Sequence, residues 1–166
     1  MSGGGITIAE AAAVAARLHA EGKRIVLANG CFDLLHVGHI RYLREAKSLG
    51  DVLFVGINGD AAVTRLKGAG RPLLPAAERA EMLAALRAVD HVVIFDDDTA
   101  DRLVAAVRPH VHAKGTDYSA ADVPEAGTVR ASGGRVVIAG DPKGHSTREL
   151  ISAIVERFGP TPRHRG

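Results

Sequence analysis

Five short apolar runs alternate with helical segments along almost the whole chain, and this alternation constrains the fold more than any other feature. The runs are rich in Val, Ile, Leu and Ala and show little of the regular polar spacing of half-exposed strands. Such runs are typical of strands that are covered on both faces, as in parallel sheets. The sequence therefore predicts an α/β fold with a five-stranded parallel sheet and helices on both faces. The predicted strands are residues 24–28, 52–57, 92–95, 111–114 and 135–139.

Start signals mark the helices between these strands. Thr7 and Ser146 each stand three residues before a glutamate, which is the capping-box pattern. Asp60 suits an N-cap, and Pro75 suits the first turn of a helix. The helices predicted from these signals and from the apolar spacing are residues 7–20, 37–49, 60–66, 75–88, 99–107, 125–131 and 146–158.

Length, charge and cysteine content limit the number of domains, the kinds of partner and the compartment that we expect. The chain has 166 residues, of which 46% are apolar, and this suits one domain with a sizeable core. A formal net charge of +2 gives no reason to expect a nucleic-acid partner. The single cysteine excludes an intrachain disulfide and suits a reducing compartment. No apolar run approaches the ~18 residues of a membrane span, and no signal peptide is visible. We therefore expect a cytoplasmic protein with no membrane partner.

Polar residues follow the predicted strands. The turn around His36 follows the first strand, Asn58 the second and Asp96 the third, while Lys114 ends the fourth and residues 140–146 follow the fifth. In parallel α/β sheets, ligands bind beyond the carboxyl ends of the strands. These loops are therefore expected to converge on one ligand-binding edge.

The turn between the first strand and the next helix carries the strongest functional signal. It reads Asn-Gly-Cys-Phe-Asp-Leu-Leu-His-Val-Gly-His from Asn29 to His39. Backbone N–H groups and the helix dipole favour anions at such a helix start, and histidine side chains add hydrogen-bond donors. Gly30 and Gly38 permit close approach of a ligand to the backbone. The turn therefore predicts a site for a phosphate chain.

The spacing of His36 and His39 alone leaves two other interpretations open. The pair could simply pack against the helix or cap it. A zinc site fits less well, because a zincin pair is spaced four residues apart, contains a glutamate and needs a third ligand.

The segment from Gly30 to His39 resembles the signature of the nucleotidyltransferase superfamily, in which Gly-x-Phe-Asp is followed by His-x-Gly-His. The resemblance implies a Rossmann-like, doubly wound nucleotidyltransferase domain over residues 23–158. Residues 1–22 are then an N-terminal leader and helix, and residues 159–166 a flexible C-terminal tail. His36 and His39 are implied to be catalytic. The implied nucleotide-binding residues of this segment are Asn29, Gly30, Cys31, Phe32, Asp33, Gly38 and His39.

The loop Arg-Leu-Lys-Gly-x-x-Arg-Pro, which contains Lys67 and Arg71, resembles a loop of one branch of this superfamily, the heptose-1-phosphate adenylyltransferases. The resemblance implies that Lys67 is catalytic and that Lys67 and Arg71 bind substrate phosphate. Arg79 matches a family arginine that faces the nucleotide. An ordinary ion pair with Glu78 or Glu81 on its own helix is an equally open interpretation of Arg79.

Two later segments carry the same resemblance. Lys-Gly-x-Asp-Tyr follows the fourth strand, and a Ser-Thr pair opens the last helix. They imply nucleotide binding by Lys114, Gly115 and Asp117, and by Ser146 and Thr147. A turn made by Gly115 and Asp117, and a simple N-cap at Ser146, are the alternatives that need no ligand.

The resemblance also implies a reaction. ATP and D-glycero-D-manno-heptose 1-phosphate would give ADP-heptose, a lipopolysaccharide precursor, and pyrophosphate. Mg²⁺ is the implied cofactor, held through the phosphates rather than by direct protein ligands, with Asp33 orienting either the turn or the metal's hydration shell. ATP and a sugar 1-phosphate are the implied partners, and members of the family often form homodimers.

Two other functions stay open. Glycerol-3-phosphate cytidylyltransferases are related, but their Arg-Thr-Glu-Gly-Ile lead-in differs from the residues at positions 141–145 here. A nucleotide-binding module without turnover belongs to another class, and the presence of His36, His39, Lys67 and Ser146 argues against it.

Some polar residues are expected to have no such role. His110 and His112 share one face of the predicted fourth strand, where two surface histidines are a simpler interpretation than a metal pair. Cys31 has no orienting third group nearby in the sequence, so a thiol nucleophile is not expected. The aspartates at 96–98 suit a solvated turn and a helix cap better than a metal site.

Overall fold

A five-stranded, wholly parallel sheet forms the centre of the protein in the computed structural model, which describes residues 4–142 and 144–160. The strand order is β3-β2-β1-β4-β5, so the chain moves outward from β1 to β3 and then returns to the other side of β1. The parallel, doubly wound prediction is confirmed, and the switch point lies between β1 and β4. The strands are β1 (Ile25–Gly30), β2 (Val52–Asn58), β3 (His91–Phe95), β4 (Val111–Lys114) and β5 (Arg135–Ile138).

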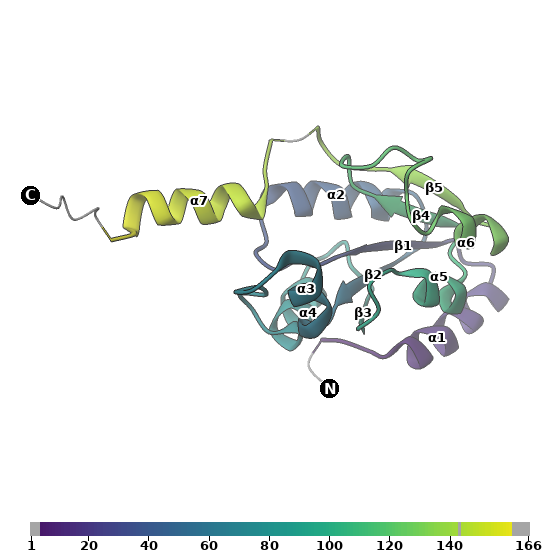
Figure 1. Cartoon of the computed structure of the whole chain (residues 1–166). Helices are drawn as coiled ribbons and strands as arrows, with labels where there is room; N and C mark the ends of the chain where they lie inside the picture. Colours follow the sequence, from purple (N-terminus) through teal and green to yellow (C-terminus); the bar gives the residue numbers. More distant parts are fainter. Residues whose placement is uncertain (1–3, 143, 161–166) are drawn as a thin grey trace, which may run out of the picture.

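Helices cover both faces of this sheet (Figure 1). α2 and α4 pack on one face, and α1, α5 and α6 pack on the other. α3 follows β2 at the carboxyl edge, and α7 ends the described chain. The helices are α1 (Ile8–Ala20), α2 (Val37–Ser48), α3 (Asp60–Lys67), α4 (Ala76–Ala84), α5 (Asp101–Val107), α6 (Ala126–Ala131) and α7 (Thr147–Phe158).

The two apolar layers explain why the first four residues of β1 are apolar. Val26 and Ala28 pack toward α2 and α4, whereas Ile25 and Leu27 pack toward α1 and α5. All four are fully buried. Because alternate side chains enter different layers, neither face tolerates a regular polar position.

The N-terminal segment is part of this packed structure. Thr7 and Glu10 form the expected capping box, and α1 contributes buried residues to the core. Ile6 pairs with Val93 of β3 in an isolated parallel bridge. Gly5, expected within a leader, lies so close to Ile94 that a Cβ would come within 2.8 Å of its side chain. Residues 1–3 of the leader lie outside the described residues.

α7 projects away from the rest of the protein (Figure 1). Ser146 caps it by accepting a hydrogen bond from the Glu149 N–H, as its sequence pattern predicts. None of its described residues is buried, and Phe158 is 82% exposed. Within the described residues, no helix is both long and apolar enough to cross a membrane. Residues 161–166 of the predicted tail lie outside the described residues.

Some local predictions are wrong. Asp60 is the first residue of α3 rather than its N-cap, which is Gly59. The Asp60 carboxylate instead accepts a hydrogen bond from the Ala76 N–H at 2.8 Å, at the start of α4. α4 ends at Ala84 rather than near residue 88, and α5 begins at Asp101 rather than at residue 99. His112, expected at the surface, is 0% exposed, because the face of β4 on which it lies is covered by α5 and α6.

Candidate active site

Two histidines at the start of α2 form the centre of the candidate site. His36 is the N-cap, in extended conformation, and its ring stacks on that of His39 with 3.8 Å between centroids. The His36 backbone N–H donates to His39 Nδ1 at 3.3 Å. Because this nitrogen accepts, the neutral His39 ring carries its proton on Nε2. The turn therefore holds His39 as a hydrogen-bond donor through Nε2.

Both histidines favour the neutral form. Burial, with a smaller contribution from His36, lowers the pKa of His39 to about 4. Burial also lowers the pKa of His36, with His145 acting in the same direction and Glu149 opposing it. At neutral pH the pair therefore offers N–H donors rather than two positive charges.

His145 is a third histidine at this position, and sequence reasoning missed it as a site residue. A Cβ on Gly38 would lie 2.9 Å from the His36 ring and 3.3 Å from His145 Cβ, so the two histidines meet over this glycine. Gly38 was expected to leave room for a phosphate, and in this structure the His36 ring lies against it. The sequence signal for His145 was its place directly before the cap of the last helix.

Asp33 anchors the loop at residues 71–74. Its carboxylate accepts hydrogen bonds from Arg71 Nε at 2.5 Å and from the backbone N–H groups of Leu73 and Leu74 at 2.8–2.9 Å. Burial opposes ionisation of Asp33, but these hydrogen bonds and the Arg71 charge outweigh it and hold the pKa of the carboxyl below its usual value. The Asp33 carboxylate therefore holds the loop at residues 71–74 against the turn after β1, and Arg71 is ion-paired to it.

Arg79 is 1% exposed and joins the turn after β1, the end of β2 and the segment before α4. Its guanidinium donates to the carbonyl oxygens of Cys31, Asn58 and Leu74 at 2.7–2.9 Å. It also pairs with the Asp60 carboxylate at 2.8 Å, rather than with either glutamate of its own helix. The contacts of Arg79 give it the geometry of a positioning residue for the loops after β1 and β2.

Lys67, Cys31 and Phe32 complete this side of the site. Lys67 is the exposed last residue of α3. Burial raises the pKa of the Cys31 thiol, and the nearby charge of Lys67, together with those of two arginines, offsets part of the rise. Phe32 has a positive φ of 47°, which is rare for a large side chain and recurs at active sites and ligand clamps. Its ring lies 5.1 Å from that of His39.

Lys114 lies on the other side of β1 and is almost fully buried. Its Nζ is 3.4 Å from Asn29 Oδ1 and 3.6 Å from Glu125 Oε2, and it lies over the Tyr118 ring at 4.8 Å. Burial lowers the pKa of Lys114, and Glu125 opposes that shift. The same Asn29 oxygen lies 2.8 Å from His112 Nε2.

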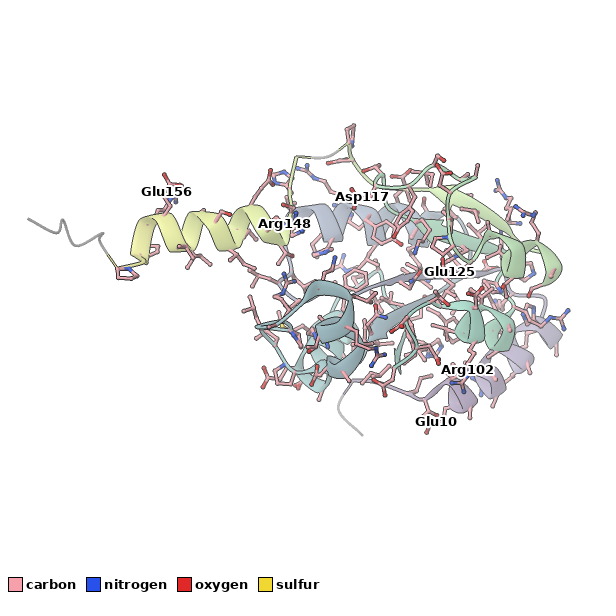
Figure 2. All side chains as sticks on the ribbon, in the orientation of Figure 1. Glu10, Arg102, Asp117, Glu125, Arg148 and Glu156 are labelled. Atoms are coloured by element: carbon pink, nitrogen blue, oxygen red, sulfur yellow. The ribbon has the colours of Figure 1, made fainter. Side chains whose placement is uncertain are left out.

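The remaining predicted residues lie in the loops after β4 and β5. Gly115 is half-buried and Asp117, which Figure 2 labels, is exposed; both lie in the loop after β4. Ser146 caps α7, and Thr147 Oγ1 donates to the Leu34 carbonyl at 3.1 Å, which joins α7 to the loop after β1. The structure thus brings the predicted residues of β1, β4 and α7 to the carboxyl edge of the sheet.

No group of three or more His, Cys, Asp or Glu side chains is arranged to hold a metal within residues 4–142 and 144–160. The Asp33 oxygens are already engaged by Arg71 and by two backbone N–H groups. A metal at this site would therefore be coordinated by ligand oxygens rather than by a protein cluster.

The sequence pattern that defines the cytidylyltransferase-like family matches residues 27–153, from β1 into α7. The chain belongs to this family. The match includes the stacked histidines, the Asp33 anchor and the capped start of α7. The matched range therefore contains most of the carboxyl edge described above.

Curated relatives support this family membership. The bifunctional protein HldE of Pelobacter propionicus is 51% identical over 139 residues, which are 84% of this chain and 28% of that protein. HldE of Geobacter metallireducens is 52% identical over 140 residues, 84% of this chain and 29% of that protein. HldE of Streptomyces coelicolor is 48% identical over 144 residues, 87% of this chain and 31% of that protein. The chain thus spans under a third of the length of these relatives.

Solved structures share the fold. The lipopolysaccharide core biosynthesis protein of Thermoplasma volcanium has a TM-score of 0.64 and 27% identity, and the match covers 74% of this chain and all of that one. The pantoate-beta-alanine ligase of Francisella tularensis has a TM-score of 0.61 at 14% identity, with coverage of 87% and 71%, and supports the family's fold alone.

Proposed function

We propose that this protein is an adenylyltransferase that moves AMP from ATP to D-glycero-D-manno-heptose 1-phosphate. The products are ADP-heptose, a lipopolysaccharide core precursor, and pyrophosphate. The observation that carries the proposal is the neutral His36–His39 pair at the start of α2, beside the switch point between β1 and β4. The HldE relatives, about half identical to this chain, support the choice of sugar phosphate.

The residues suit transfer without a strong base. The sugar phosphate is already an anionic nucleophile, so its oxygen attacks the α-phosphorus in line, the bond to the bridging oxygen breaks, and pyrophosphate leaves. The enzyme's task is positioning and stabilisation of charge. His39 Nε2–H and His36 donate to phosphate oxygens, and the free N–H groups of α2 face the same chain. Lys67 is the exposed cation beside this turn.

The other binding roles divide into direct and indirect ones. Asn29, Gly30, Cys31 and Phe32 line the turn at the end of β1, and Gly38 lies in the first turn of α2. Lys114, Gly115, Asp117, Ser146 and Thr147 supply the opposite side of the nucleotide site. Arg79 and Asp33 act by fixing the loops. Arg71 would reach substrate phosphate while its guanidinium keeps contact with Asp33.

Mg²⁺ fits this arrangement as the counterion of the ATP phosphates. When bound, it would neutralise charge on the pyrophosphate leaving group. Asp33 contributes indirectly, because it holds the loop on which Arg71 stands.

Pyrophosphate release tests the proposal. The protein is incubated with Mg²⁺, either anomer of the heptose 1-phosphate, and ATP or CTP in turn. We expect release with ATP and one anomer. Release only with CTP and glycerol 3-phosphate would assign a cytidylyltransferase, the alternative function within the same enzyme class. ATP binding without release from any phosphosugar would assign a non-catalytic nucleotide-binding module.

We also propose a cytoplasmic homodimer that pairs through α7. The exposed apolar side chains Leu150, Ile154, Val155 and Phe158 recur along this helix and make a surface suited to a second copy of the chain. Analytical ultracentrifugation should show a dimer for the wild type and a monomer for Phe158→Glu. A wild-type monomer at high concentration would reject the dimer but leave the proposed reaction intact.

A further inference from the structure

His112 is fully buried on β4, directly behind the candidate site, and the proposed reaction gives it no task. Its Nε2 lies 2.8 Å from Asn29 Oδ1, on the neighbouring strand β1. Lys114 Nζ approaches the same oxygen at 3.4 Å. Two side chains of β4 therefore meet one amide oxygen at the carboxyl end of β1.

The lysine settles the orientation of this amide. An ammonium group only donates, so the Asn29 atom that Lys114 approaches must be the acceptor oxygen. His112 Nε2 then donates to the same oxygen, and the other ring nitrogen carries no proton. His112 Nδ1 is buried and has no hydrogen-bond partner among the described residues. Burial, reinforced by the Lys114 charge, lowers the pKa of His112 to about 4, although Glu125 and Asp101 oppose this shift. The neutral ring is thus the form in this structure.

Glu125 fixes the lysine in turn. Its Oε1 accepts a hydrogen bond from the Ala100 N–H at 3.0 Å, just before α5, and its Oε2 lies 3.6 Å from Lys114 Nζ. Glu125 lies beside α5 and α6 in Figure 2, and it is only 3% exposed. The buried Glu125 carboxylate therefore helps to position Lys114, one of the two donors to the Asn29 oxygen.

The Asn29 NH₂ group is what this arrangement leaves available. Its oxygen is engaged by two donors, and among the described residues its nitrogen donates to no protein acceptor. Asn29 is half-buried and stands at the carboxyl end of β1, where the phosphate site begins. We propose that His112 is a positioning residue that fixes the Asn29 amide so that its NH₂ donates to a phosphate oxygen of the bound nucleotide. The proposal rests on nucleotide binding by the proposed function, but not on the identity of the sugar.

Removing the His112 donor should leave the Asn29 side-chain amide free to rotate, without removing any direct contact to the nucleotide. His112→Leu is expected to weaken ATP binding about tenfold and to raise KM for ATP by a similar factor, with kcat within about twofold of wild type. His112→Gln keeps an N–H within reach of Asn29 and should recover binding to within about threefold. His91→Leu, which removes a half-buried histidine from β3 far from Asn29, is the matched control and should bind ATP normally.

A double-mutant cycle separates this role from general packing. ATP affinity is measured by calorimetry for wild type, Asn29→Ala, His112→Leu and the double variant. If His112 acts through Asn29, the double variant binds no more weakly than Asn29→Ala alone. Should His112→Leu fail to fold, His112→Asn takes its place, because its shorter side chain cannot reach the Asn29 oxygen.

The outcomes are distinct from those that test the reaction. If ATP binds but no heptose 1-phosphate releases pyrophosphate, the proposed function fails while the cycle still decides the role of His112. Additive losses in the double variant, wild-type affinity in His112→Leu, or no ATP binding by the wild-type protein would each overturn the proposal.

Discussion

Arg79 and Asp33 hold the loops after β1 and β2 through buried charges, whereas α7 lies on the opposite side of the site and projects outward. Arg79 donates to three backbone carbonyls, and Asp33 accepts from two backbone N–H groups and from Arg71. Within residues 4–142 and 144–160, the Thr147 bond to Leu34 is the one hydrogen bond between α7 and the body. The donors near β1 are therefore preorganised, while those of α7 depend on local capping.

Arg79→Met should show the largest effect, because it leaves buried carbonyls without their donor. We expect the free energy of unfolding, measured by urea denaturation, to fall by roughly 3 kcal/mol. Arg102→Met removes an arginine whose side chain is 73% exposed, and serves as the control with a change of under about 0.5 kcal/mol. A loss below about 1 kcal/mol for Arg79→Met would remove the contrast between the two sides.

His39→Ala tests the chemistry of the preorganised side. Losing one transition-state donor should cut kcat by ~10² or more while the circular dichroism spectrum is retained. His19, whose Nε2 bonds the Val107 carbonyl at the far end of the sheet, supplies the control variant His19→Ala. Turnover of His39→Ala within a few-fold of wild type would reject the proposed role.

Acidification should lower the free energy of unfolding through His39, on the side of the site near β1. The folded-state pKa of His39 is about 4, and burial is the main cause. Between about 6.5 and 4 the unfolded chain binds a proton that folded His39 does not, so stability falls as the pH drops and is fully present above 6.5. In His39→Asn, the loss of unfolding free energy between pH 7 and 4.5 should shrink by about 2 kcal/mol. An unchanged pH dependence would mean that His39 titrates normally.

Thr147→Val tests the α7 side and should have the smallest effect. Loss of the bond to Leu34 is expected to cost about 1 kcal/mol of nucleotide binding, seen as a roughly fivefold rise in KM for ATP. Thermal unfolding should change little. Ser152→Ala, on the exposed part of α7, is the matched control. A large drop in melting temperature for Thr147→Val would show that α7 contributes to the core after all.

Several features of the fold that depend on residues close together in the sequence were predicted correctly. The Thr7 capping box and the Ser146 cap depend on residues a few positions apart, so the sequence revealed both. Strand order follows from packing between distant segments, and no local pattern could place β4 beside β1. Asp60 illustrates the limit, since it lies at a helix start but accepts from the N-terminus of a different helix.

The sequence indicated which residues belong to the candidate site, but not which atoms they contact. The spacing of His36 and His39 placed them at one helix start, but not their stacking or the proton position on His39. The residues around Arg79 in the sequence suggest a ligand contact or a local ion pair, but two of its three carbonyl partners, Cys31 and Asn58, are far away along the chain. His112 was expected at the surface, although any strand of a doubly covered sheet buries both of its faces.

Because α7 projects outward, a small change of its angle at the site produces a larger displacement at its far end. Its 12 residues extend roughly 18 Å from a cap that adjoins the stacked histidines. A tilt of about 10° at Ser146 would displace the far end by roughly 3 Å. In the monomeric variant Phe158→Glu, a spectroscopic label near Glu156, which lies on the outer part of the helix in Figure 2, would therefore move by more than the residues around the phosphates do.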